Sequence, residues 1–450
     1  LAAFLLGAAY LLLGPEVGQT RARDAVITTL TTILLVSDYL GLLIRNPMPP
    51  FVLLLQGASF TGIILTFVIA SRLYLSPSRL QVLLKVSSVM IAYNFIVSLN
   101  QHYSILKIAT PLLGLTARLF YATTNAFGVF GSASSNGQYA MMLLALLVPL
   151  VAVSNSREKL RIVPLYYVPV IVICWLTIIL ANTRAAALEA IVIMVIYTIM
   201  FSLLYRRSFR NSKYINLSSA GAVMFLVAAG VWVGLQNIES DFQAVKIDSA
   251  SSIESGEALN RAGPWKFGER VLAEGSWWIG FGHGNDKSNL LAWGGRWRGT
   301  GRMTQDLKPG EIIGGGHFHN LYLALPTLYG WFGAIAYVLL FVVVVVRLVG
   351  AIRRYPLDNI VVATCLGFAM SLVFFLFDEL KSGNAVQTIN YAMVAWIWLG
   401  LGLATHRTLI FEAAAARARK AAVESDSDGA EKGGPGAPRN RVASGEGKRV

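Results

Sequence analysis

The chain has 450 residues, of which 55% are hydrophobic and only 14% are charged, and its mean hydropathy is +0.58. A water-soluble domain carries about 25% charged residues, so this composition excludes a soluble globular protein and indicates a chain that lies mostly in lipid. In a soluble protein, the formal net charge of +14 would indicate binding to nucleic acid. In a membrane protein basic cytoplasmic loops account for it, and no nucleic-acid partner is expected.

Apolar runs close to the ~20 residues that cross a bilayer as a helix recur along the chain. Helices are expected because each satisfies its own backbone hydrogen bonds within lipid. About eleven spans are predicted from the apolar runs, at residues 1–14, 25–45, 51–71, 80–99, 137–154, 162–181, 185–205, 215–236, 319–346, 359–378 and 387–405. A weaker candidate over 109–128 would be re-entrant or interfacial. The expected fold is an all-α polytopic membrane protein with about 11–12 transmembrane helices.

The connections between these spans alternate in charge. The basic ones mark the cytoplasmic side, and they fall at 20–23, 71–79, 156–161, 206–213 and 347–354. The near-neutral loop 237–318 is then periplasmic or extracellular. Four regions are predicted: an N-terminal transmembrane bundle over 1–236, a long, partly helical periplasmic loop over 237–318, C-terminal transmembrane helices over 319–405, and a cytoplasmic tail over 406–450. In the tail, 411–420 would extend the last helix, and 421–450 would be disordered because Gly, Ser, Pro and charged residues dominate it.

Several basic residues fall on the predicted outer side. Arg184 lies between two spans with almost no loop, where an arginine opposes the positive-inside bias. The alternative is an arginine that reaches the lipid headgroups. Residues 259–272 have the pattern of an amphipathic helix that ends in a glycine-rich turn. A helix lying on the membrane surface is the simple interpretation, and it would also hold Arg261 and Lys266 close to a lipid-borne anion.

The segment 291–308 places Arg296 and Arg298 beside Trp293 and Trp297. Arginine interleaved with tryptophan suits sugars and phosphates, because guanidinium groups grip phosphate oxygens and rings stack on sugars. An ordinary solvated loop is the alternative for this segment.

His317 and His319 follow three glycines at the start of an apolar run. They would cap a helix, bind a metal or accept a proton. Two ligands are too few for a metal site, and His283 as a third has no carboxylate at a recognisable spacing, so no metal is expected. A neutral imidazole titrates near neutral pH and can activate a hydroxyl group.

“HN” at 319–320, nine further residues and “GWFG” at 330–333 resemble the H-[N/S/Q]-x9-G-x-x-G pattern of lipopolysaccharide O-antigen ligases. These belong to the O-antigen ligase/polymerase superfamily of polytopic, GT-C-like glycosyltransferases. Three further stretches resemble the superfamily layout, at 130–147, 182–190 and 260–284. Tyr329 departs from the pattern, since the superfamily often has Glu before the first glycine. Thr183 stands where Ser is common, and His317 is an additional histidine.

The resemblance implies a transferase in the bacterial inner membrane, multi-pass, with its active site facing the periplasm. The donor would be a glycan on undecaprenyl diphosphate and the acceptor a sugar hydroxyl of lipid A-core. Arg184, Arg261 and Lys266 would bind the diphosphate, and His319, or His317, would be the catalytic base. Transfer would be inverting and metal-independent, with no cofactor and no nucleotide sugar. Candidate glycan or lipid contacts are Arg118, Asn136, Arg296, Arg298, Trp265 and Trp278.

Two other functions stay open. A polymerase of lipid-linked repeat units commonly has two sizeable outer loops, whereas here only 237–318 is long, with 100–136 as a candidate second. A transporter of lipid-linked glycan would usually show repeat halves and polar residues at the membrane midplane, and the sequence displays neither. The spacing and the single long loop favour the ligase.

Overall fold

The structure is a computed structural model. It describes the residues given in the following ranges: 24–45, 50–103, 126–130, 132–154, 164–208, 268–269, 271–273, 275–283, 320–355, 359–380 and 389–432. Within these ranges the regular secondary structure is helical throughout, with no strand. This confirms the all-α prediction for the part of the chain that the structure describes.

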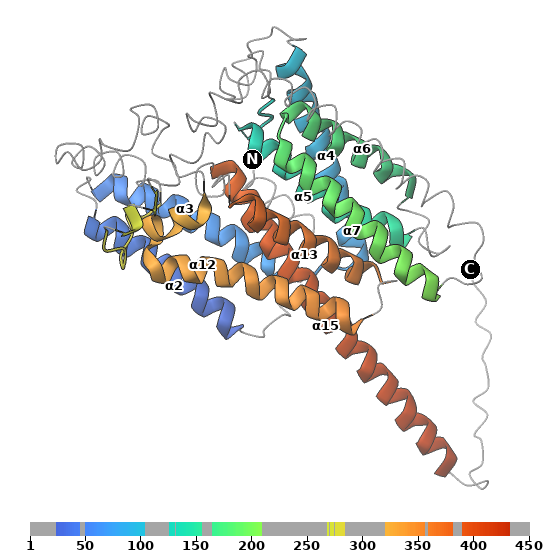
Figure 1. Ribbon diagram of the computed structural model, residues 1–450. Helices are drawn as coiled ribbons and strands as arrows, with labels where there is room; N and C mark the ends of the chain where they lie inside the picture. The colour runs from blue at the N-terminus through green and yellow to red at the C-terminus, as the bar shows by residue number, and fades with distance from the viewer. Residues whose placement is uncertain are drawn as a thin grey trace, which may run out of the picture.

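The long helices lie side by side along one common direction (Figure 1). In chain order they are α2 (Ala25–Arg45), α3 (Pro50–Ser71), α4 (Pro77–Tyr103), α5 (Ala133–Ser154), α6 (Pro164–Ala181), α7 (Arg184–Ser208), α12 (Leu321–Arg354), α13 (Ile360–Asp378) and α15 (Ile389–Lys432). Each of them coincides with a predicted span. The predicted spans 1–14 and 215–236 and the weaker candidate 109–128 lie outside the described residues.

Six of the described helices, α2, α4, α5, α12, α13 and α15, are long and apolar enough to cross a membrane. The apolar parts of α3, α6 and α7 are shorter. Large apolar side chains on the outer surface suit contact with lipid tails, and they include Leu43, Phe51, Val89, Phe332, Val346 and Phe377. The fold is therefore that of an all-α, multi-pass membrane protein.

α5 and α13 form the buried centre of the bundle, and small residues bring them together. A Cβ atom added at Gly367 of α13 would stand 2.8 Å from Cα of Leu146 on α5. The hydroxyl of Ser371 donates a 2.7 Å hydrogen bond to the carbonyl of Met142. In lipid no hydrophobic force joins two apolar helices, so close packing and interhelical hydrogen bonds of this kind hold them together.

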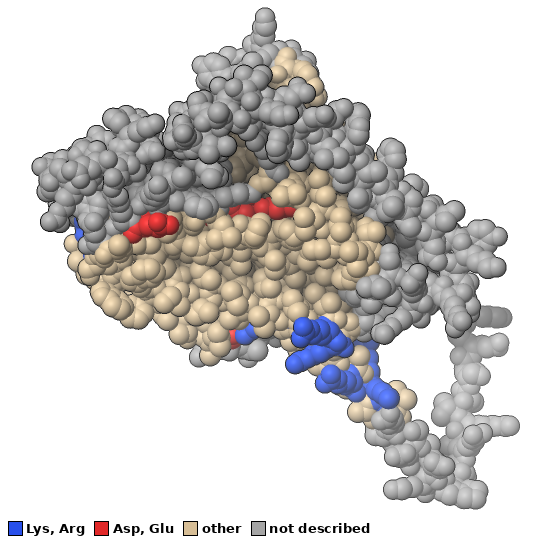
Figure 2. All heavy atoms as spheres, in the orientation of Figure 1, with Lys and Arg blue, Asp and Glu red and all other residues tan. Residues whose placement is uncertain are grey.

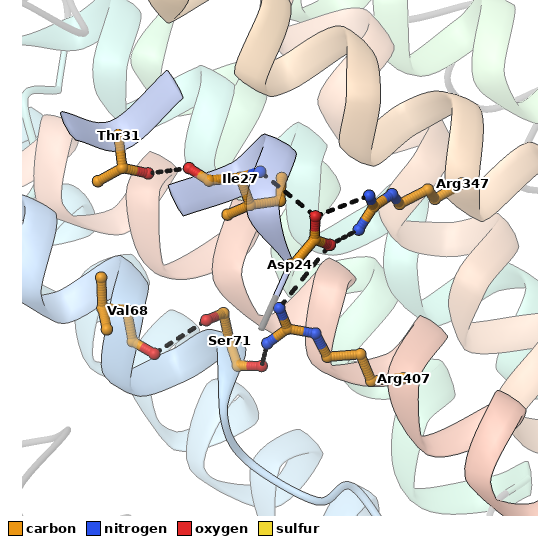
Figure 3. A network of polar contacts seen from close by, with 7 residues as sticks. All are labelled: Asp24, Ile27, Thr31, Val68, Ser71, Arg347 and Arg407. Carbon is orange, nitrogen blue, oxygen red and sulfur yellow. Dashed lines mark hydrogen bonds and ion pairs between the residues drawn. The ribbon is translucent and has the colours of Figure 1, made fainter. Parts of the chain in front are cut away.

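One end of the bundle carries an ion-pair network, which Figure 3 shows from close by. Both guanidinium NH groups of Arg347 on α12 donate to the carboxylate of Asp24, which directly precedes α2. Arg407 on α15 lies 4.0 Å from the same carboxylate and donates a 2.8 Å hydrogen bond to the carbonyl of Ser71, where α3 ends. We call this the basic end. Its contacts bring residues of the predicted basic connections 71–79 and 347–354 to the same side of the bundle as the start of α2.

The helices alternate in direction, so the starts of α5, α7, α12 and α15 lie at the other end, which we call the opposite end. Figure 2 shows most of the visible Lys and Arg atoms at one end of this face, Asp and Glu atoms along the opposite edge, and a broad band without charge between them. A band of this kind matches the hydrocarbon core of a bilayer.

Two helices continue further than predicted. α12 does not end at 346 but runs through 347–354 to Arg354, because Leu348 and Ala351 keep this last part of the helix packed in the bundle. α15 runs to Lys432, which corrects the expected start of disorder at 421. Residues 413–424 are rich in Ala, Arg, Lys and Glu, all strong helix formers, and this local preference continues the helix beyond the bundle (Figure 1).

Candidate functional site

The start of α12 is fixed against the end of α13 at the opposite end of the bundle. Asn320 is the N-cap of α12, and its side-chain oxygen accepts hydrogen bonds from the N–H groups of Tyr322 and Leu323 at 2.9 and 3.3 Å. The N–H of Leu321 donates to the carbonyl of Glu379 at 2.9 Å. The asparagine of the “HN” motif therefore sets where α12 begins, because it satisfies backbone donors that the first turn leaves unpaired.

The starts of α5 and α7 meet at the same end. A Cβ atom added at Gly137 on α5 would stand 2.0 Å from the hydroxyl oxygen of Thr183, which directly precedes α7, so only glycine fits there. Arg184 is the first residue of α7. Its backbone therefore begins beside the start of α5, and nothing is described of its side chain.

Asn136 has a structural role in this region. It is fully buried, its Nδ2 group donates to the hydroxyl of Ser98 and the carbonyl of Ala126 at 3.0 Å each, and its Oδ1 accepts from Asn94 at 2.6 Å. Nearby, the amide of Gln101 exchanges two hydrogen bonds with the backbone of Gly128. This network fastens 126–130 between α4 and α5, and Asn136 is at its centre.

Three buried carboxylates belong to the opposite end: Glu189 on α7, Asp378 at the end of α13, and Glu379 directly after it. Glu379 lies beside the start of α12, since its carbonyl accepts the N–H of Leu321. Buried carboxylates are costly unless cations or hydrogen-bond donors accompany them. The opposite end thus carries acidic side chains next to the start of α12.

Residues 275–283, which we call the glycine-rich turn, insert where α12 is interrupted. Gly330 has φ 68° and ψ 173°, which breaks the helix there. The N–H groups of Phe281 and Gly282 donate to the carbonyls of Thr327 and Leu328, and the N–H of Trp331 donates to the carbonyl of Trp277, each at 2.8 Å. The turn thus replaces the hydrogen bonds that the break removes from α12.

α2 closes on the other side of the turn through a buried polar contact. The backbone N–H of His283 donates a 2.6 Å hydrogen bond to Oδ1 of Asp38, which is fully buried in α2. The ring Nδ1 of His283 lies 3.2 Å from the hydroxyl of Tyr329, and Phe60 stacks on both rings. Burial lowers the pKa of His283 from 6.5 to about 4, so the docked imidazole is neutral at neutral pH.

The two neighbouring tryptophans of the turn have different surroundings. Trp277 is buried, and its indole N–H donates to the carbonyl of Val271 at 2.7 Å. The guanidinium of Arg45 lies 5.1 Å from its ring centroid. Trp278 is 63% exposed and packs on Phe332. Of these two rings, only that of Trp278 is exposed. The turn is thus not simply laid on the membrane surface but packed into the bundle.

Most of the residues predicted for the site lie outside the described residues: His317, His319, Arg261, Lys266, Arg118, Arg296, Arg298 and Trp265. Asn136 and Trp278 are described, and of Arg184 only the backbone is. Among the described residues no three His, Cys, Asp or Glu side chains gather in a way that could hold a metal ion. His283, which was considered as a third metal ligand beside His317 and His319, has its ring Nδ1 next to the hydroxyl of Tyr329.

Asp38, Glu189, Asp378 and Glu379 were missed by the sequence interpretation, although a signal for them exists. Asp38 and Glu189 each lie inside a predicted span, and an ionisable residue within a membrane helix is by itself a functional-site hypothesis. Asp378 and Glu379 come at the end of a predicted span, and Lys381 follows closely. In the sequence this pattern resembles an ordinary polar connection between two spans.

A scan against models of known protein families finds no match for this chain, and a search of curated proteins finds no significant relative. The described fold defines the class, an all-α multi-pass membrane protein.

Proposed function

We propose that the chain is a membrane glycosyltransferase of the O-antigen ligase kind. It would move a glycan from undecaprenyl diphosphate to a sugar hydroxyl of lipid A-core on the periplasmic face, in lipopolysaccharide biosynthesis. The basic end would face the cytoplasm of a bacterium, in keeping with the positive-inside rule, and the opposite end would carry the active site.

One observation carries the proposal. Three of the four stretches that resemble the superfamily, 130–147, 182–190 and 319–333, contain the starts of α5, α7 and α12, which gather at the opposite end. The fourth, 260–284, ends in the glycine-rich turn that packs on α12. Motifs that are far apart in the sequence thus belong to one region of the bundle, as a common site requires.

Arginine side chains would stabilise the leaving group. Negative charge develops on the diphosphate as the glycosyl bond breaks, and cations fixed in a water-poor site oppose it strongly. Arg184, Arg261 and Lys266 are the residues proposed for this role. Arginine keeps its charge in such surroundings and holds phosphate oxygens through paired N–H groups, which supports transfer without a divalent metal.

His319 is the proposed base that takes the proton of the acceptor hydroxyl, with His317 as the other imidazole to test. The residue that follows His319 caps α12, and Leu321 is bonded to the backbone of Glu379. Buried Asp378 and Glu379 therefore belong to the segment against which α12 begins. A carboxylate close to an imidazole stabilises the imidazolium that proton transfer creates.

The remaining contacts would serve the glycan and the lipid. Trp278 is exposed beside apolar Phe332, which supports a contact with lipid or with the polyprenyl chain. Arg118, Arg296, Arg298 and Trp265 are proposed for the glycan and the headgroup region, where arginine and aromatic rings suit phosphates and sugars.

Transfer by the purified protein tests the proposal. The protein in lipid nanodiscs is given a glycan on undecaprenyl diphosphate, once with lipid A-core and once without a second acceptor. Glycan on lipid A-core supports the ligase, whereas longer lipid-linked chains support a polymerase. Donor that stays intact in both reactions contradicts either transferase, and movement of that donor across a vesicle membrane would instead support a transporter.

A further inference from the structure

The glycine-rich turn, residues 275–283, is bonded to two helices, α12 and α2. At the break in α12 three backbone groups lose their helical partners, namely the carbonyls of Thr327 and Leu328 and the N–H of Trp331. The turn supplies a partner to each of them at 2.8 Å. Because buried backbone groups without partners are costly, the broken helix and the turn stabilise each other.

Glycines make this contact one of backbone on backbone. A Cβ atom added at Gly280 would stand 2.1 Å from the carbonyl oxygen of Leu328 on α12. One added at Gly41 on α2 would stand 2.7 Å from the backbone nitrogen of Gly282. The turn is thus held between α12 and α2 at distances that no larger residue allows, which gives it one defined position.

Asp38 secures the turn from α2. Its Oδ1 accepts the backbone N–H of His283, and its Oδ2 has no hydrogen-bond partner among the described residues. A buried carboxylate that accepts a backbone hydrogen bond is costly to leave unbonded, so departure of the turn from α2 is opposed. Tyr329 holds the ring of the same histidine.

The glycine-rich turn also fixes the helical segment that precedes it. Val271 is fully buried, its carbonyl accepts the N–H of Gly275 at 3.0 Å, and it also accepts the indole N–H of Trp277 at 2.7 Å. Val271 belongs to the stretch 260–274, whose sequence also includes Arg261 and Lys266.

We propose that Asp38 and Tyr329 are positioning residues for the donor site: by docking the glycine-rich turn they set the place of the preceding helix, and with it the affinity for a lipid-linked diphosphate. The inference rests on the proposed function for its ligand, whereas the docking itself stands on the contacts. Neither residue touches the donor; both act through the backbone and ring of His283.

The test uses the full chain in lipid nanodiscs. The variants are Asp38→Ala, Asp38→Asn and Tyr329→Phe, with Thr31→Ala as the control, because Thr31 lies on the same helix and its hydroxyl bonds only to Ile27 within that helix. Hydrogen exchange of the amides of Phe281 and Gly282 reports docking without any donor. Steady-state transfer with a glycan on undecaprenyl diphosphate then gives KM and kcat separately.

Asp38→Ala is expected to raise exchange at Phe281 and Gly282 about tenfold and to raise KM for the donor about tenfold, with kcat within about threefold of wild type. Asp38→Asn keeps an oxygen that accepts the His283 N–H, so it should restore most of the wild-type KM. Tyr329→Phe removes only the hydroxyl and should give a smaller rise in both quantities. Thr31→Ala should match wild type.

Unchanged exchange in both Asp38→Ala and Tyr329→Phe would overturn the docking role. Raised exchange with an unchanged KM would overturn the positioning role and leave the docking standing. A wild-type protein that transfers no glycan but protects Phe281 and Gly282 would refute the proposed function, and with it the role toward the donor, while the exchange data still decide the docking.

Discussion

The backbone N–H of His283 donates a 2.6 Å hydrogen bond to Oδ1 of Asp38, although 245 positions separate the two residues in the chain. The bond joins the long loop between α7 and α12 to a helix near the beginning of the chain. The bond explains why the carboxylate of Asp38 is buried in an apolar helix, because it accepts the hydrogen bond that docks the glycine-rich turn on α2. It also makes the turn that follows the “NRAGPWKFGER” stretch part of the bundle.

Gly330→Ala should destabilise the protein by about 1–3 kcal/mol, because φ 68° with ψ 173° is a conformation that essentially only glycine adopts. The added Cβ atom would also stand 2.3 Å from the carbonyl oxygen of Trp278. Thermal unfolding of the purified protein in one detergent measures the effect. Gly350→Ala is the matched control on the same helix.

At Gly350 an added Cβ atom meets nothing within 4 Å. Alanine is favoured over glycine within a helix by about 0.5–1 kcal/mol, so Gly350→Ala should leave Tm unchanged or raise it. Equal Tm shifts in the two variants would contradict the role of Gly330.

The contribution of His283 to docking of the glycine-rich turn should weaken as the pH falls. Burial holds the pKa of His283 at about 4, whereas the free imidazole has 6.5, so between these values the undocked form binds more protons than the docked one. The stability that the neutral ring contributes is complete above pH 6.5 and is lost as the pH falls toward 4, by roughly 3 kcal/mol in all. Exchange at Phe281 and Gly282, corrected for the intrinsic pH effect, should therefore rise more between pH 7.5 and pH 5 in the wild type than in His283→Gln.

His283→Gln is the control for this pH dependence, because glutamine does not titrate in that range. Asp38 is present in both proteins, so any pH effect of that carboxylate is common to them and the difference between them reports His283. A pH effect of equal size in wild type and His283→Gln would assign the change to another group, with Asp38 the first to examine because it faces the same turn.

The positions of the described helices follow from hydrophobic patterning alone. Every one coincides with a run of apolar residues, and α2 matches its predicted bounds of 25–45. Composition decides this, because lipid requires long apolar segments that satisfy their own backbone. The two ends that went wrong differ in cause: beyond 346 the buried residues Leu348 and Ala351 continue α12, whereas beyond 421 helix propensity rather than burial extends α15.

The contacts within the site could be predicted less well. Of the two glycines of “GWFG”, Gly333 admits a neighbouring helix, since an added Cβ atom would stand 2.8 Å from Cβ of Ser37 on α2. Gly330 instead breaks α12 and receives the glycine-rich turn. No periodicity encodes that difference, because it depends on which segment of the loop returns to the helix. The same holds for Tyr329, whose partner His283 becomes its neighbour only in the fold.

Asn136→Ala should lower the stability of the protein without any donor present. It would leave the side chains of Asn94 and Ser98 and the carbonyl of Ala126 short of a partner, at a cost of about 1–3 kcal/mol for a buried group. Thermal unfolding measures this, with Ser59→Ala as the control, since Ser59 is partly exposed and its hydroxyl bonds to the carbonyl of Leu55 within its own helix. An unchanged Tm together with weaker transfer would instead support the predicted glycan or lipid contact of Asn136.

The ion pair of Asp24 with Arg347 should stabilise the basic end. Asp24→Asn and Arg347→Gln each leave a half-buried charge with fewer partners, and each should cost about 1–2 kcal/mol. A double-mutant cycle isolates the pair: the double variant should be more stable than the two single losses predict when added. Strictly additive losses would mean that the two residues do not interact. Transfer activity should be retained by all three, because the network lies at the end of the bundle away from the proposed site.

His319→Ala and Arg261→Ala should each abolish glycan transfer to lipid A-core while the protein still inserts and keeps its Tm. His319 is needed as the base, and loss of a single general base typically lowers a rate by about 10²–10⁴-fold. Arg261 would bind the diphosphate of the donor and also oppose its charge as it leaves, so its loss should raise KM for the donor as well as lower kcat. His317→Ala, made in parallel, decides between the two imidazoles: the variant that loses kcat identifies the base. Full activity in either His319→Ala or Arg261→Ala would refute the assignment of that residue.

Transfer that is blocked by EDTA and restored by a divalent cation would replace the metal-independent mechanism with a metal-assisted one.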